Sequence, residues 1–168
     1  MTKIAMKNWV VLYTRSRWEK KVDKLLSDQN ITCFCPLVKR NRKWVDRNKV
    51  VEMPLFNSYL FINATPLELT KAIQTNGVIN YVSHCGKPAV ISDKEIDRIR
   101  NTVRVYSDIE TLPLNDINIG DRVKIKNGLL IDHTGEIKEI HGKAVVMIIE
   151  KLNCVLTVKI DQNQLLHA

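Results

Sequence analysis

The residues of this chain with the most distinctive chemistry are aromatic and basic. Residues 54–62 read P-L-F-N-S-Y-L-F-I, a pattern that predicts a strand over Tyr59 to Ile62. Side chains alternate along a strand, so Tyr59 and Phe61 share one face and Leu60 and Ile62 share the other. An exposed aromatic face is typical of a docking surface. A buried one is ordinary core, and the sequence leaves both readings open.

Residue types that carry catalysis are present without the spacing that catalysis needs. The histidines are His84, His133, His141 and His167, and the cysteines are Cys33, Cys35, Cys85 and Cys154. The histidines show neither metal-ligand spacing nor an adjacent nucleophile. The cysteines form no C-x-x-C pair, and no glycine-rich phosphate loop occurs. We therefore expect neither an enzyme nor a metal or cofactor.

Positive charge is concentrated in the first third of the chain. The net charge is +8, and residues 1–50 hold 13 Lys and Arg against 4 Asp and Glu. The remaining residues hold 13 against 14. The basic residues form two groups: Arg15, Arg17, Lys20 and Lys21, then Lys39, Arg40, Arg42, Lys43 and Arg47. Such segregation favours a nucleic acid nearby, while a solvated basic face is the plainer reading.

The pattern of elements predicts an α+β domain that positions these residues. A strand is expected over Trp9 to Tyr13 and a hairpin over Trp44 to Glu52, turning near residues 46–48. Three S/T-x-x-E capping boxes mark helix starts, at Ser16 and Glu19, Thr65 and Glu68, and Ser92 and Glu95. The resulting order is β-α-β-β-α-β plus an extra helix. We expect an antiparallel, ferredoxin-like sheet with its helices on one face.

The chain changes character after residue 104. Residues 105–116 are acidic, contain a proline and predict a linker. Residues 117–168 are rich in short strands and glycine or asparagine turns, which predicts a small five-stranded β-barrel. The expected domains are therefore 1–104 and 117–168.

Three segments resemble the NusG family of transcription factors. W-V-V-L-Y-T at 9–14 with R-W-E-K-K-V at 17–22 is similar to the start of its N-terminal (NGN) domains. P-L-F-N-S-Y-L-F-I is similar to the family strand P-L-F-P-G-Y-V-F-V. G-D-R-V at 120–123, with Gly128 and Gly135, resembles the KOW motif of its SH3-like C-terminal barrels. The 17–22 segment and the hairpin W-V-D-R-x-K-x-V-E most resemble the specialised UpxY-type paralogues, which act on polysaccharide operons.

This resemblance implies a function and assigns residues to it. The N-terminal domain would bind the clamp helices of RNA polymerase and suppress pausing or termination. The residues implied in polymerase binding are Tyr13, Phe56, Tyr59 and Phe61. Those implied near upstream or non-template DNA and nascent RNA are Arg15, Arg17, Lys20, Lys21, Arg40, Arg42, Lys43 and Arg47. The KOW barrel would recruit a ribosomal protein or a termination factor.

A stand-alone RNA-binding protein is the alternative. RNA-recognition modules share this topology and stack bases on aromatic strands. Their signature requires glycine before the first aromatic residue and glycine or alanine between aromatics, where this chain has Ser58 and Leu60. The start of the chain lacks a signal-peptide pattern, and no apolar run reaches the roughly 18 residues that span a membrane. We expect a cytoplasmic monomer without membrane association.

Overall fold

The computed structural model describes residues 5–114, 139–140 and 143–159 of the chain. The chain divides into two compact units, Met1–Val105 and Tyr106–Ala168. Within the described part, no helix is both long enough and apolar enough to cross a membrane.

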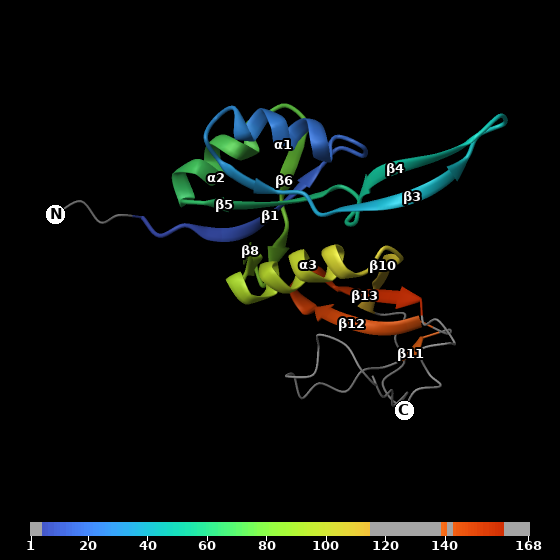
Figure 1. Ribbon diagram of the computed structural model, residues 1–168. Helices are drawn as coiled ribbons and strands as arrows, with labels where there is room; N and C mark the ends of the chain where they lie inside the picture. Colours follow the sequence, from blue (N-terminus) through green and yellow to red (C-terminus); the bar gives the residue numbers. More distant parts are fainter. Residues whose placement is uncertain (1–4, 115–138, 141–142, 160–168) are drawn as a thin grey trace. The chain divides into compact units, whose positions relative to one another are not determined.

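The first unit is built on an antiparallel sheet with the strand order β2-β5-β1-β6 (Figure 1). The strands are β1 (Asn8–Thr14), β2 (Thr32–Phe34), β5 (Tyr59–Ala64) and β6 (Val78–Tyr81), and a short β9 (Val90–Ile91) also pairs with β1. Helix α1 (Glu19–Ser27) follows β1, and α2 (Pro66–Ile73) follows β5. The expected β-α-β-β-α-β order is confirmed.

Helices α1 and α2 cover one face of this sheet (Figure 1). The core between them is apolar and contains Val10, Leu12, Val22, Leu26, Ile31, Leu60, Ile62, Ala64 and Ala72. Leu12 and Leu60 are directly opposite each other on neighbouring strands. Alternate residues of β1 and β5 therefore point into this core, and the residues between them point away from α1 and α2.

The expectation that the helices lie on one face of the sheet is wrong for the third helix. Helix α3 (Asp93–Val105) lies on the side of the sheet opposite α1 and α2 (Figure 1). Its Asp93 Oδ1 accepts a hydrogen bond of 3.0 Å from Trp9 Nε1 of β1. Helix periodicity fixes which residues of α3 are apolar, but it does not specify the sheet face on which they pack.

Two of the three expected capping boxes form. Thr65 and Glu68 exchange hydrogen bonds at the start of α2, and Ser92 and Glu95 do the same before α3. The Thr65 backbone N–H, together with Lys7, holds the pKa of the Glu68 carboxyl below its usual range. The third expectation is wrong, because α1 begins at Glu19 and Trp18 occupies its N-cap position without a side-chain hydrogen bond.

Two hairpins extend from the sheet's connections. Strands β3 (Leu37–Lys43) and β4 (Asn48–Pro54) form a two-stranded ribbon that begins earlier than the hairpin expected from Trp44. Strands β7 (Ser83–His84) and β8 (Lys87–Pro88) form a short second one.

The second unit contains an antiparallel sheet with the order β10-β13-β12-β11. Its elements are β10 (Ile109–Pro113), β11 (Glu139–Ile140), β12 (Lys143–Ile149), the 3₁₀ turn η2 (Glu150–Leu152) and β13 (Cys154–Lys159). Part of the segment expected to be a linker is thus a strand paired with β13. No closed barrel is seen in the described residues, and the KOW signature at 120–135 lies outside them.

Two glycines give a matched test of packing in the first unit. Gly77 has φ +95°, and a Cβ there would clash with the Trp18 ring. Gly86 has φ +74° with no atom within 4 Å of such a Cβ. We expect Gly77→Ala to lower the free energy of unfolding by about 3 kcal/mol, from backbone strain plus overpacking. Gly86→Ala should cost only about 1 kcal/mol.

Denaturant unfolding of the two variants measures this difference. Equal losses would contradict the packing of Trp18 over Gly77.

Candidate functional site: the aromatic sheet face and the basic hairpin

The register of β1 and β5 gathers the aromatic residues on the sheet face opposite α1 and α2. Tyr13 pairs with Tyr59, and Val11 pairs with Phe61. Phe34 of β2 is opposite Phe61 on the next strand. The alternative in which the aromatic residues face α1 and α2 is therefore excluded.

The rings form two groups, one around Phe61 and one made by the two tyrosines. Phe61 lies 5.2 Å from Phe56 and 5.9 Å from Phe34, between ring centroids. Tyr13 and Tyr59 meet edge to face at 5.9 Å. These distances are typical of favourable aromatic pairs. The four residues implied in polymerase binding, Tyr13, Phe56, Tyr59 and Phe61, thus belong to one face or its margin.

Exposure separates these four residues into two kinds. Tyr13 is 43% exposed and Tyr59 is partly exposed. Phe56 and Phe61 are 3% and 0% exposed. A partner docking here would touch the two tyrosines, while the two phenylalanines are packed in the interior.

Helix α3 closes one end of the aromatic face. The Arg100 guanidinium lies 5.6 Å from the centroid of the Trp9 ring and 5.0 Å from that of Phe34, in cation–π geometry. Asp93, which accepts from Trp9, is two helical turns away on the same side of α3. Sequence reasoning missed these residues, although the Asp93–Arg100 spacing was the signal that could have linked them.

A buried carboxylate fixes the turn that leads into Tyr59. Glu19 is 4% exposed, and its Oε1 accepts a hydrogen bond of 2.6 Å from the Ser58 backbone N–H. The Ser58 carbonyl in turn accepts from the Thr14 N–H at 2.8 Å. Ser58 has φ +62°, a left-handed conformation that glycine adopts at less cost. The family strand has glycine at this position. The bond to Glu19 therefore stabilises a left-handed conformation that is unfavourable for serine.

The basic residues around α1 are all exposed, and some have local partners. Lys21 Nζ lies 4.0 Å from the Trp18 ring centroid, and the Arg15 guanidinium lies 5.7 Å from it. Lys20 Nζ donates to the Glu52 carbonyl at 2.7 Å, which ties α1 to β4. Arg17 stands at φ +63° and is exposed.

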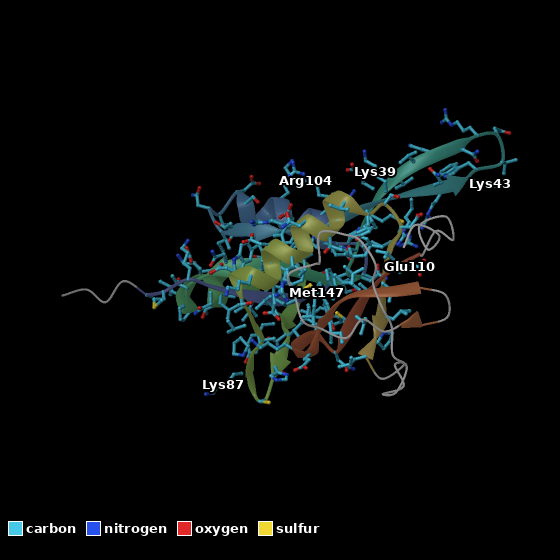
Figure 2. All side chains as sticks on the ribbon, turned by 60° about the horizontal axis from the view of Figure 1, so that its bottom comes forward. Lys39, Lys43, Lys87, Arg104, Glu110 and Met147 are labelled. Atoms are coloured by element: carbon cyan, nitrogen blue, oxygen red, sulfur yellow. The ribbon has the colours of Figure 1, made fainter. Side chains whose placement is uncertain are left out.

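The second basic group lies on the β3–β4 hairpin, where Figure 2 shows Lys39 and Lys43. Arg42, Lys43 and Arg47 are exposed, and Arg40 is half-buried. Arg42 Nη2 lies 3.6 Å from Met53 Sδ across the ribbon. The structure therefore places these four residues on one projecting element.

Three of the four cysteines are at least partly buried, and Cys85 is exposed. Burial raises the pKa of the thiols of Cys33, Cys35 and Cys154 to about 12, so they stay protonated at neutral pH. In the part of the chain that the structure describes, no group of three or more His, Cys, Asp or Glu residues could hold a metal ion. His84 lies in β7, whereas His133, His141 and His167 lie outside the described part.

The chain is similar to known transcription proteins. The family model NusG, described as transcription termination factor nusG, matches residues 7–100. A solved structure titled "Domain interaction in Thermotoga maritima NusG" is 22% identical, with a TM-score of 0.50, over 91% of this chain and 93% of that chain. At this identity the likeness concerns the fold. No curated protein matches the chain.

Removing the Glu19 carboxylate should loosen the turn before Tyr59. We expect Glu19→Ala to lower the free energy of unfolding by about 2 kcal/mol, because it leaves the Ser58 N–H without its charged acceptor. Glu19→Gln keeps an oxygen acceptor and should lose less.

Ser16→Ala distinguishes this arrangement from a capping box. It should change stability little, because α1 has no side-chain cap. A loss of about 1 kcal/mol in Ser16→Ala, with none in Glu19→Ala, would contradict the observed bonding.

Proposed function

The chain belongs to the NusG family, and we propose that it is a transcription elongation and antitermination factor that docks on RNA polymerase through Tyr13 and Tyr59. Members of this family are transcription factors that bind RNA polymerase. The observation that carries the proposal is the pair formed by the exposed Tyr13 and the partly exposed Tyr59, on a sheet face that α1 and α2 leave uncovered. The partner on the polymerase would be the clamp helices.

The arrangement suits a docking role because paired strands hold the two tyrosines side by side. The tyrosines are paired with each other on adjacent strands, and the rings of Phe56 and Phe61 pack together separately. A preformed aromatic pair loses little conformational entropy on binding. Tyrosine is also among the residues that dominate interface energies.

The basic residues would then lie near nucleic acid. Docking beside the polymerase cleft would bring Arg15, Arg17, Lys20 and Lys21 towards upstream or non-template DNA. It would bring Arg40, Arg42, Lys43 and Arg47 of the hairpin close to DNA or nascent RNA. By binding the elongating conformation more tightly than the paused one, the protein would suppress pausing or termination.

The finer features of the proposal rest on the sequence resemblance. The UpxY-like segments at 17–22 and 44–52 point to a specific set of operons, such as polysaccharide biosynthesis loci. The C-terminal unit would recruit a ribosomal protein or a termination factor. The protein would act in the cytoplasm, as a monomer and without catalysis.

Burial disfavours the alternative of base stacking at Phe61. Phe61 is 0% exposed, so its ring offers no surface to a base.

Alanine substitutions separate docking from folding. We expect Tyr59→Ala to weaken binding of the full chain to core RNA polymerase by about tenfold or more, while the circular dichroism spectrum is unchanged. Phe61→Ala should instead lower the free energy of unfolding by about 3–5 kcal/mol, because it empties a core site. Leu67→Ala is the control, since Leu67 is 68% exposed on α2, which covers the other face.

A peptide copy of the clamp helices should compete with the wild-type chain for binding. Polymerase binding by Tyr59→Ala equal to that of the wild type, or unaffected by the peptide, would contradict the proposed site.

A further inference from the structure

The tip of the β3–β4 hairpin exposes a tryptophan. All residues from 41 to 50 are exposed, Trp44 is 66% exposed and Val45 is 103% exposed. Burial of a tryptophan side chain is strongly favourable, so one left in water at a tip has a surface available to a ligand.

The turn at the tip fixes the backbone that carries this side chain. The Trp44 backbone N–H donates to the Arg47 carbonyl at 3.0 Å. The Arg47 backbone N–H donates back to the Trp44 carbonyl at 3.3 Å. The ribbon below is paired continuously from Leu37 with Pro54 to Lys43 with Asn48. The backbone at Trp44 is thus fixed by its turn and by the ribbon below.

Positive charge outweighs the one acidic residue of the tip, Asp46, at a cost to the hairpin. Lys43 and Arg47 flank the tip, and Arg42 is directly opposite Lys49 on the partner strand. Like charges facing each other across a strand pair destabilise the pair. A polyanion bound here would remove that repulsion, whereas a neutral or basic partner would not.

We propose that Trp44 stacks on an unpaired base of a single-stranded nucleic acid while Arg42, Lys43, Arg47 and Lys49 bind the phosphates beside it. An aromatic ring among cations matches the two chemical features that a single strand presents, the face of a base and the backbone charge. A duplex offers the charge, but its base faces are stacked within the helix. The inference deepens the proposed function, because it names the ligand of the hairpin.

The test uses the full chain and fluorescently labelled single-stranded DNA, single-stranded RNA and duplex DNA of equal length. Anisotropy titrations at several salt concentrations give the affinities. Trp44→Ala should weaken single-strand binding about tenfold, as expected for a lost base–aromatic stack, without changing the salt dependence. Duplex binding should not change. The nucleic acid that shows the larger Trp44 effect, DNA or RNA, identifies the strand that the hairpin prefers.

Two further variants give the test its controls. Val45→Ala removes apolar surface from the same tip and should bind single strands like the wild type. Arg47→Gln should weaken single-strand and duplex binding alike and reduce the slope of log affinity against log salt by about one. Trp44→Phe should retain most of the affinity but lose the quenching of tryptophan emission that a stacked base causes.

Unchanged single-strand affinity in Trp44→Ala, or an equal loss for duplex, would overturn the inference. So would a loss in Val45→Ala as large as that in Trp44→Ala. The assay contains no polymerase, so its failure and the failure of the Tyr59 test are distinguishable.

Discussion

The site depends on the pairing register between β1 and β5. That register sets Tyr13 opposite Tyr59 and Leu12 opposite Leu60. A slip of one residue would turn Tyr59 into the core beneath α1 and bring Leu60 to the opposite face. Both faces specify the same alignment, because the apolar core occupies one and the aromatic rings the other. The Glu19–Ser58–Thr14 connection holds the alignment at the point where β5 begins.

The residues of this face differ in burial, which separates those that pack in the interior from those that a partner could contact. Phe56 and Phe61 are buried and lock the strand face, and Trp9 and Phe34 are held at its end by Asp93 and Arg100 of α3. Tyr13 is exposed and Tyr59 is partly exposed on the same face. The basic residues lie elsewhere, around α1 and along the hairpin. A protein partner and a nucleic acid could therefore bind at the same time through different chemistry.

Local patterns predicted most of the first unit. The strand at Trp9–Tyr13, the capping boxes at Thr65 and Ser92 and the existence of a hairpin depend on neighbours in sequence. The failures involve distant contacts. Glu19 has the spacing of a capping residue but bonds to Ser58, far along the chain. Which face α3 covers, and how deeply Phe61 is buried, depend on tertiary packing that period and spacing do not specify. The sequence could not predict that the Trp44 side chain is exposed, because exposure depends on the tertiary structure.

Site-specific photo-crosslinking from position 59 of the full chain to RNA polymerase tests the central claim most directly. We expect a photoreactive side chain at position 59 to crosslink to the clamp helices, and one at Leu67 on α2 to give no such product. A crosslink from 59 to another part of the polymerase, or equal crosslinking from 59 and 67, would contradict docking through the Tyr13–Tyr59 face.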